Sequence, residues 1–251
     1  MIGAIIGDIV GSRFEFNNTF DPHFDLFHRD CSFTDDTICT VAIADAILRD
    51  EDYKTALLQW CRQYPFPRGG YGGSFARWLE PPDHQPYNSY GNGAAMRVSP
   101  VGWAFSDGEV VRQAMLSAMP THNHVEGLIG AACVAEAIAI ERGGANSAYV
   151  ECRWYDLAGD GIRVPEPGVF DETCQGCVPL AFSLLAGANS FEEAIRRAVA
   201  YGGDSDTLAA IVGSLAEARF GVPDELVVEA MRFLPPKMKQ VITKFREKYV
   251  E

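Results

Sequence analysis

Long apolar segments in which small residues recur at helical spacing constrain the fold of this 251-residue chain most strongly. Residues 124–142 (HVEGLIGAACVAEAIAIER) predict an Ala-rich helix that ends at Gly143-Gly144. Three more segments have apolar residues at helical spacing: 37–49, 175–187 and 207–219. The segments 175–187 and 207–219 are also rich in small residues, so they predict buried helices in close contact. No alternating run of convincing length lies between hairpin turns, and strands do not alternate with helices. The sequence therefore predicts an all-α protein.

Shorter signals indicate further helix boundaries and the domain organisation. Ser190 followed by Glu193 is typical of a capping box. Asp224 is expected to cap the helix that follows it, and the amphipathic residues 238–250 predict a last helix. Gly and Pro gather in three predicted loops, none with the composition of a domain linker: 65–73, 80–93 and 159–168. With no internal repeat, residues 1–251 are predicted to form one compact globular domain of many helices.

The charge balance excludes some classes of partner. The chain has 34 Asp and Glu residues against 21 Lys and Arg, a formal charge of -13, which argues against an extended nucleic-acid surface or an anionic membrane as partner. An anionic small molecule is compatible, because a bound divalent metal reverses the local field. The seven Cys follow no regular framework, and the segment MIGAIIGDIVGS does not have the features of a secretory signal. No apolar run is as long as a membrane helix. We therefore predict a cytoplasmic protein with reduced thiols. We expect a monomer.

Two acidic clusters each stand where an apolar helix is predicted to begin. The first is residues 33–37 (FTDDT), and the second is residues 202–207 (GGDSDT). Helix capping explains either cluster alone, because hydroxyls and carboxylates are favoured at helix N-termini. The recurrence of the same residue types favours a shared role. If the two helix starts converge, four carboxylates surround one space, and they repel each other unless cations lie among them. Oxygen donors without His or Cys favour Mg²⁺, Mn²⁺ or Ca²⁺ over zinc.

Three further segments accompany these clusters in a fixed order. They are residues 7–15 (GDIVGSRFE), 89–97 (SYGNGAAMR) and 121–127 (THNHVEG). Together the five segments resemble the signatures of the ADP-ribosylglycohydrolase, or ADP-ribosyl-acceptor hydrolase, family, and they span most of the chain. The resemblance implies an all-α fold with a binuclear magnesium or manganese centre.

The resemblance also implies residue roles, carried over by position. The implied metal ligands, for two Mg²⁺ or Mn²⁺ ions, are Thr34, Asp35, Asp36, Asp204, Asp206 and Thr207. The predicted catalytic residues are Glu15, Asp35 and Asp206, with Glu15 as the candidate general acid or base. From the residues alone, Glu15 would be an exposed loop acid. Asp8 is interpreted as an internal helix cap and receives no catalytic role.

Glycine-rich turns at residues 71–74 and 89–93 can place backbone N–H groups against phosphates. The family implies that they hold the pyrophosphate and distal ribose of ADP-ribose. The predicted substrate-binding residues are Gly72, Gly73, Ser89, Tyr90, Gly91, Asn92, Gly93, Met96 and His122. Tyr90, Trp103 and Phe105 are candidates for stacking on adenine, with core packing as the alternative. Arg97 is predicted to serve either structure or binding.

The predicted reaction is metal-dependent hydrolysis of the bond between C1 of the terminal ribose and an acceptor atom, which releases ADP-ribose. The acceptor can be a modified protein side chain, a nucleic acid or a small molecule, and the residues do not distinguish among these. One alternative is a catalytically silent ADP-ribose-binding or toxin-neutralising protein of the same fold, which the intact metal set disfavours. Another is a magnesium-dependent phosphoesterase that cleaves a nucleotide pyrophosphate and releases AMP.

Overall fold

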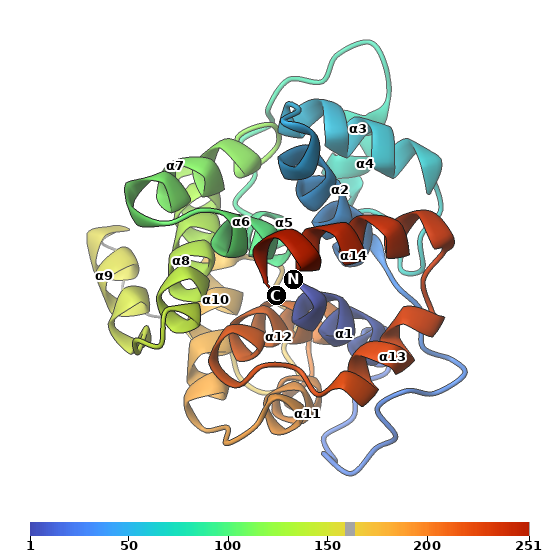
Figure 1. Cartoon of the computed structure of the whole chain (residues 1–251), viewed down its shortest axis with the longest axis vertical. Coiled ribbons are helices and arrows are strands. Elements are labelled where there is room, and N and C mark those ends of the chain that lie inside the picture. Colours follow the sequence, from blue (N-terminus) through green and yellow to red (C-terminus); the bar gives the residue numbers. More distant parts are fainter. Residues whose placement is uncertain (159–163, 251) are drawn as a thin grey trace.

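The structure, a computed structural model, describes residues 1–158 and 164–250. Within these residues the chain forms fourteen α-helices and no β-strand, and one isolated antiparallel bridge joins Gly91 and Thr173. The helices are α1 (Ile2–Gly11), α2 (Asp35–Arg49), α3 (Tyr53–Gln63), α4 (Gly73–Leu79), α5 (Gly93–Met96), α6 (Ser99–Ala104), α7 (Asp107–Ala118), α8 (Val125–Arg142), α9 (Ala148–Ala158), α10 (Cys174–Ala186), α11 (Phe191–Tyr201), α12 (Ser205–Phe220), α13 (Asp224–Arg232) and α14 (Pro236–Tyr249). The predicted all-α class is confirmed, and the helices form a single compact domain (Figure 1).

Helix α12 lies at the centre of the domain, with α1, α8, α10 and α11 packed against it (Figure 1). Its residues from Ser205 to Glu217 are all buried. The closest crossing is with α1, because a Cβ atom on Gly7 would lie 2.0 Å from the carbonyl oxygen of Ala209. A Cβ atom on Gly11 would lie 2.5 Å from the Cα atom of Asp206. Glycine on this face of α1 therefore brings the end of α1 against the start of α12.

Most predicted helix boundaries agree with the structure. Gly143 follows α8, and α10 packs against α12 as expected. The Ser190 side chain caps α11 by accepting from the Glu193 amide, but Glu193 accepts from the amide of Asn189, so the reciprocal half of the box is absent. The prediction that Asp224 caps α13 is wrong. Pro223 occupies the cap position and Asp224 is already the first helical residue, where its charge still favours the helix dipole.

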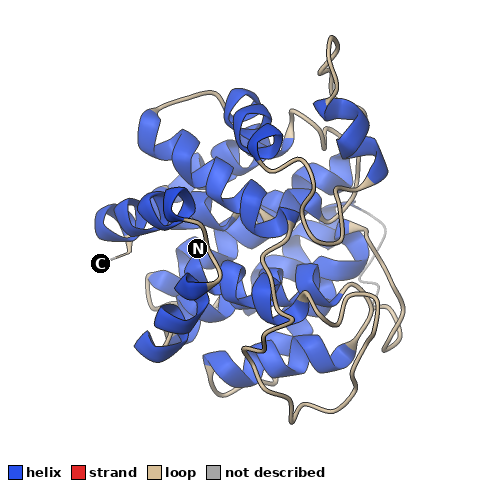
Figure 2. Ribbon diagram, turned by 90° about the vertical axis from the view of Figure 1, so that its right-hand side faces the viewer, coloured by secondary structure: helices blue, strands red, loops and turns tan. Residues whose placement is uncertain are grey.

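Long connections run across one side of the helices (Figure 2). Three of them join α1 to α2, α3 to α4 and α4 to α5, and a fourth precedes α10. Of the predicted loop at 159–168, residues 164–168 precede α10, and residues 159–163 lie outside the described part of the chain. Several predicted site residues lie on these connections or at the helix starts where they end: Glu15 before α2, Gly72 and Gly73 at the start of α4, and Ser89 to Gly93 at the start of α5.

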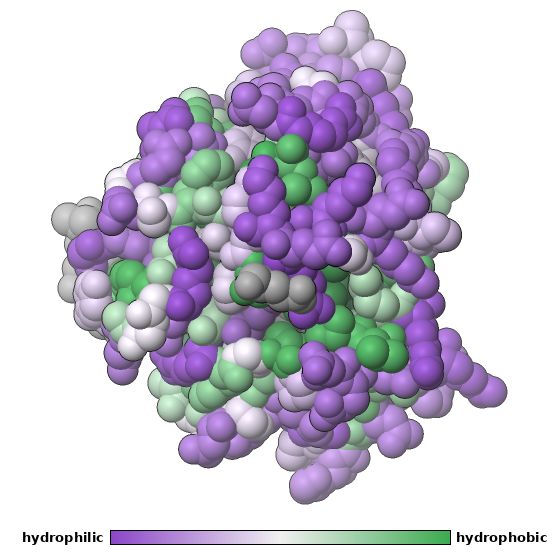
Figure 3. All heavy atoms as spheres, viewed as in Figure 1, coloured by the Kyte–Doolittle hydropathy of each residue, from purple (hydrophilic) through white to green (hydrophobic). Residues whose placement is uncertain are grey.

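The surface and the helices can be compared with the expectations from charge, apolar runs and cysteines. On the face shown in Figure 3, hydrophilic surface predominates and hydrophobic atoms form separate patches. Among the described helices, none is long and apolar enough to cross a membrane. The six cysteines whose side chains are described are all buried and free, which agrees with the prediction of reduced thiols.

Candidate functional site

A cavity of about 360 Å³ lies where the starts of α2, α4, α5 and α12 meet. Its volume is within the range of small-molecule sites, about 300 to 1,000 Å³. Most of the predicted site residues line it: Glu15, Asp35, Asp36, Gly72, Gly73, Ser89, Gly91, Asn92, Gly93, Met96, His122, Asp204, Asp206 and Thr207. Residues from the five sequence segments therefore meet at one place in the fold.

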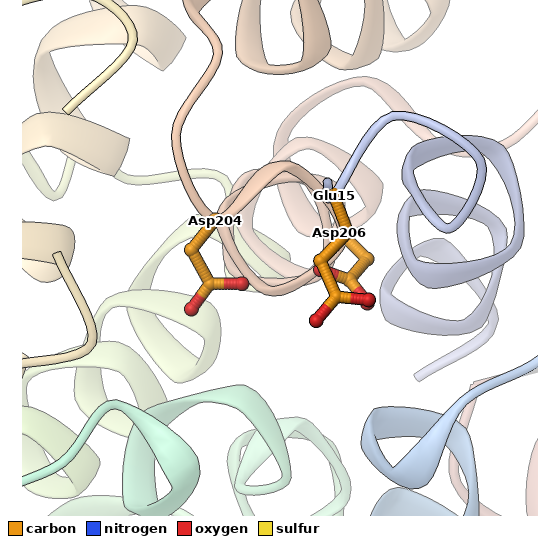
Figure 4. Close-up of side chains that lie close together, drawn as sticks. All are labelled: Glu15, Asp204 and Asp206. Carbon is orange, nitrogen blue, oxygen red and sulfur yellow. The ribbon is translucent and has the colours of Figure 1, made fainter. Parts of the chain in front are cut away.

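The two acidic clusters converge in this cavity. The hydroxyl of Thr207, at the start of α12, donates to Oδ2 of Asp36, at the start of α2, over 3.3 Å. Carboxylate oxygens of Glu15, Asp204 and Asp206 all lie within 4.8 Å of one another. Figure 4 shows these three side chains beside the first turn of α12, with their carboxylates directed to the same side. The arrangement is a set of oxygen donors around one space, as the paired clusters predicted.

The carboxylates have unusual electrostatics because they are buried together. Burial raises the pKa of Asp36 well above its usual range, and the charges of Asp8 and Asp35 raise it further. Burial likewise raises the pKa of Asp206 well above normal, with Asp204 and Asp36 adding to the effect. Oδ1 of Asp36 is buried and has no hydrogen-bond partner among the described residues. A buried anionic oxygen without a donor is a position that a divalent cation fits.

Glu15 lies on the connection that follows α1 and is half-buried at the edge of the cavity. Burial raises its pKa to about 7, and the charges of Asp204 and Asp8 contribute, while Arg68 opposes the shift. Its carboxylate lies against Gly69, where a Cβ atom would be 2.7 Å from Oε2 of Glu15. The interpretation as an exposed loop acid is therefore wrong, because the tertiary fold turns this side chain toward the acidic clusters.

Asp8 is the residue whose importance the sequence reading missed. It lies inside α1, fully buried, and does not cap its own helix. Its carboxylate accepts from the amide and hydroxyl of Thr34, at 3.0 and 2.7 Å, and from the amide and hydroxyl of Thr37. Asp8 therefore fixes the first turn of α2. Burial raises its pKa to about 6 although these hydrogen bonds lower it.

Thr34 has a structural role in this arrangement. It is the N-cap of α2, and its hydroxyl accepts from the amide of Asp36 at 3.2 Å while donating to Asp8. The capping alternative considered for the first cluster is thus correct for Thr34. Its hydroxyl also lies 3.5 Å from Oδ2 of Asp36. Thr34 does not itself line the cavity, but it lies beside Asp36, which does.

The opposite wall is built on hydrogen-bonded polar side chains. Asn92 donates from Nδ2 to Oδ2 of Asp204 at 2.7 Å and so links the glycine-rich turn to the second cluster. Arg97 is buried and donates to the Thr121 hydroxyl at 2.9 Å, which is 2.7 Å from Nδ1 of His122. Burial lowers the pKa of His122 well below normal, and Arg97 lowers it further, so the ring is neutral. Arg97 therefore has a structural role, although it also lines the cavity.

The aromatic residues at the cavity differ from those predicted. Trp103 and Phe105 do not line it, since they lie at the end of α6. The Tyr90 ring is 48% exposed and packs on His124 with ring centroids 5.3 Å apart, because the turn at 89–93 directs it outward. The aromatic residues that do line the cavity are Phe16, Tyr71, Phe75, Tyr87 and Phe170. Glu172 also lines the cavity, and no sequence signal indicated it. Phe16 could have been suspected, because it directly follows the predicted site residue Glu15.

Comparison with known proteins agrees with this fold and site. A family model described as ADP-ribosylglycohydrolase matches residues 1–249. The human protein ADP-ribosylhydrolase ARH3 is 25% identical over 306 residues, which cover 88% of this chain and 84% of the human protein. An uncharacterized protein of Archaeoglobus fulgidus is 32% identical over 155 residues, which cover 53% of this chain and 50% of that protein.

A solved structure titled ADP-ribosylglycohydrolase-related protein complex has the same fold. Its TM-score is 0.73 at 22% sequence identity, and the match covers 98% of this chain and 95% of that one. The family model and the ARH3 relative show that the chain is a hydrolase that acts on glycosyl bonds. The chain belongs to the ADP-ribosylglycohydrolase family.

Proposed function

We propose that this protein hydrolyses the bond between C1 of ADP-ribose and an acceptor in a reaction that depends on two divalent cations, Mg²⁺ or Mn²⁺. The proposal depends on one observation: the two acidic clusters lie together in a buried position, and a hydrogen bond from Thr207 to Asp36 joins them. Carboxylates in such an enclosure need cations to remain charged together. The unpartnered Oδ1 of Asp36 supports the same conclusion.

The residues that would hold the cations are those of the two clusters. Asp36, Asp206 and Thr207 line the cavity with hard oxygen donors, as do Asp35 and Asp204. Thr34 would complete the set from the cap of α2. Bound divalent ions would offset the repulsion among the carboxylates and act as Lewis acids toward ribose oxygens.

Glu15 is proposed as the general acid or base. Without metal, burial raises the pKa of Glu15 to about 7, so this carboxyl can take up and release a proton near neutral pH, as a general acid or base must. Positive charge develops on the ribose when a glycosidic bond breaks, and the surrounding carboxylates, with Asp35 and Asp206 among them, would stabilise it. Glu15 stands beside Asp204 and Asp206, which places it near that charge.

The ADP-ribose moiety is proposed to bind along the glycine-rich wall. Gly72 is the N-cap and Gly73 the first residue of α4, and Gly91 and Asn92 lead into Gly93, the first residue of α5, so backbone N–H groups are available to phosphate oxygens. The neutral His122 ring faces the turn, with Nε2 3.1 Å from where a Cβ atom on Gly93 would lie. Because Nδ1 of this ring is paired with the Thr121 hydroxyl, Nε2 would donate to a ligand hydroxyl or phosphate oxygen.

The proposal is tested by product analysis. The protein is incubated with Mg²⁺ and ADP-ribose linked to arginine, to serine or to a nucleic-acid end, and the products are separated by chromatography. Release of free ADP-ribose from at least one substrate is expected. Release of AMP instead would indicate cleavage of the pyrophosphate, and no release from any substrate would favour a silent binding protein.

A further inference from the structure

Arg97 is a buried cation on the cavity wall, and it has no ionic partner among the described residues. It directly follows α5, is 1% exposed and lines the cavity. Its Nη2 donates to two neutral oxygens, the Thr121 hydroxyl at 2.9 Å and the backbone carbonyl of Ser117 at 3.1 Å. Its Nε is buried without a hydrogen-bond partner in the described part of the chain. Because a buried charge is costly unless an opposite charge offsets it, a bound anion would stabilise this guanidinium.

The rest of the cavity lining is rich in negative charge. Its carboxylates are those of the two acidic clusters together with Glu15 and Glu172, and Arg97 is the single Lys or Arg among the described lining residues. Without bound cations, most of the lining therefore repels an anionic group of a ligand. The wall that carries Arg97 is the part of the protein itself where such a group meets positive charge.

The Thr121 hydroxyl connects Arg97 to His122 and fixes which ring nitrogen carries the proton. Thr121 is fully buried, and its hydroxyl oxygen accepts from Arg97 and lies 2.7 Å from Nδ1 of His122. The hydroxyl has one hydrogen, and Nδ1 is the acceptor that the described residues offer it, so Nδ1 accepts. Burial lowers the pKa of His122 well below normal and Arg97 lowers it further, so the neutral ring carries its proton on Nε2.

Nε2 of His122 faces the glycine-rich turn at residues 89–93. A Cβ atom on Gly93 would lie 3.1 Å from Nε2, and one on Gly91 would lie 3.5 Å from it. The ring lines the cavity and is nearly buried, and its one side-chain hydrogen bond to a described residue is made by Nδ1. The N–H group on Nε2 is therefore satisfied when a ligand oxygen occupies this part of the cavity.

We propose that Arg97 and Thr121 are positioning residues that hold His122 as a neutral Nε2–H donor, and that this donor binds a phosphate oxygen of ADP-ribose. The inference rests on the proposed binding of ADP-ribose along the glycine-rich wall and specifies the ligand group that this wall receives. A chain of hydrogen bonds that begins at a cation polarises its last donor, so Nε2–H is a stronger donor than the N–H of an isolated imidazole. The charge of Arg97 also favours an anionic phosphate oxygen over a neutral hydroxyl.

The position of the ring proton is tested on the wild-type protein without ligand. In protein labelled with ¹⁵N-histidine, long-range correlations between ring protons and ring nitrogens distinguish the two neutral tautomers. Comparison with His122→Ala identifies the signals of His122. Nδ1 is expected to be unprotonated and Nε2 protonated near neutral pH. A proton on Nδ1 would contradict the proposed chain of hydrogen bonds, and this result is obtained with Arg97 and Thr121 unchanged.

A double-mutant cycle separates positioning from a structural role. Thr121→Val keeps the shape of the side chain but removes the hydroxyl, so the affinity of Mg²⁺-loaded protein for ADP-ribose, measured by isothermal titration, is expected to fall by about fivefold to tenfold. Thr121→Ser keeps the hydroxyl and is expected to bind nearly as the wild type does. If Thr121 acts through His122, adding Thr121→Val to His122→Ala causes no further loss. The same loss in both backgrounds would make Thr121 structural and overturn the proposal.

ADP identifies the ligand group that His122 binds. ADP has the pyrophosphate but lacks the distal ribose, so Thr121→Val is expected to weaken the binding of ADP and of ADP-ribose by the same factor. A loss confined to ADP-ribose would show that Nε2 binds a hydroxyl of the distal ribose, and the phosphate assignment would be wrong.

Two variants of Arg97 test its charge. Arg97→Met removes the hydrogen bond to Thr121 and the charge together, whereas Arg97→Lys keeps a cation. The affinity for ADP is therefore expected to fall further in the methionine variant than in the lysine variant. Equal losses in the two variants would contradict a contribution of the charge to phosphate binding.

The outcomes separate this inference from the function on which it rests. If the protein binds both nucleotides with these losses but releases ADP-ribose from no substrate, the phosphate contact stands and the proposed hydrolysis fails. If it releases ADP-ribose and Thr121→Val leaves both affinities unchanged, the hydrolysis stands and the proposed positioning fails. A wild type without measurable affinity for ADP or ADP-ribose would remove the proposed binding wall and this inference together.

Discussion

Thr207 and Asp36 are 171 positions apart in the sequence, and the hydroxyl of one donates to a carboxylate oxygen of the other over 3.3 Å. This contact joins the starts of α12 and α2. It exists because glycine on α1 allows α12 to pack closely, while Asp8 on the same helix fixes α2. The short helix α1 therefore positions both acidic clusters.

Replacing Thr207 tests its assignment as a metal ligand. Thr207→Val keeps the shape of the side chain but removes the oxygen, so Mg²⁺ affinity is expected to fall by about tenfold or more. Thr207→Ser retains the hydroxyl and is expected to bind Mg²⁺ nearly as the wild type does. Isothermal titration of EDTA-stripped protein measures both. Unchanged affinity in the valine variant would remove Thr207 from the ligand set.

Asp8→Asn tests the support beneath the first cluster. The new Asn side chain carries an NH2 donor in place of one carboxylate oxygen, on the side where the hydroxyls of Thr34 and Thr37 also donate. One of these buried donors therefore loses its acceptor. We expect a loss of about 2 kcal/mol in unfolding free energy and weaker Mg²⁺ binding, measured by urea denaturation and titration. Thr37→Ser, which keeps the hydroxyl, is the control. Wild-type metal affinity in Asp8→Asn would show that Asp8 does not position the cluster.

Gly69 and Gly70 form a matched pair for testing Glu15. Both have left-handed backbone, with φ of 75° and 87°. A Cβ atom on Gly69 would lie 2.7 Å from the Glu15 carboxylate, whereas one on Gly70 would meet nothing within 4 Å. Gly69→Ala is expected to displace Glu15 and lower kcat by about tenfold or more. Gly70→Ala carries the same backbone strain and should retain most activity. Equal rates for the two variants would show that activity does not depend on the position of the Glu15 side chain.

The raised pKa values predict how stability without metal depends on pH. The pKa of Asp8 rises from 3.8 to about 6, and that of Glu15 from 4.5 to about 7. The folded protein therefore holds protons that the unfolded chain has released. The stability from these groups is present in full below about pH 4 and is lost as the pH rises through 6 and 7. With EDTA, the Tm should fall between pH 5 and pH 8.

Saturating Mg²⁺ should offset this loss, because cations bind the ionised carboxylates of the folded state. The Tm difference between Mg²⁺-loaded and EDTA-treated protein is expected to grow with pH. Differential scanning fluorimetry across this range measures it. A difference that does not change with pH would argue that the carboxylates are not linked to metal binding.

The helices and the two clusters could be predicted because their signals are local. Apolar spacing indicated α8, α10 and α12, and the capping residues indicated the start of α2. The repetition of acidic residues at two helix starts indicated that they would meet. The structure brings them together, as the contact between Thr207 and Asp36 shows.

The remaining site residues depend on tertiary contacts that leave no local pattern. Asp8 lies within a helix, but its hydrogen-bond partners are on α2. Phe170 and Glu172 reach the cavity because their segment is bonded to Asn92. Tyr90 was expected to bind substrate, yet the direction of its turn places the ring outside. Side-chain direction in loops is set by the packing around them, so residue type alone did not identify these positions.

The dependence of ADP-ribose release on Mg²⁺ tests the central claim most directly. The rate is measured for wild type, Asp36→Asn and Asp206→Asn in EDTA and at increasing Mg²⁺ or Mn²⁺. Wild-type activity is expected to vanish in EDTA and to return with metal, while both variants remain at least about a hundredfold slower. Undiminished release in EDTA, or full activity in either variant, would contradict a metal centre at the meeting of the two acidic clusters.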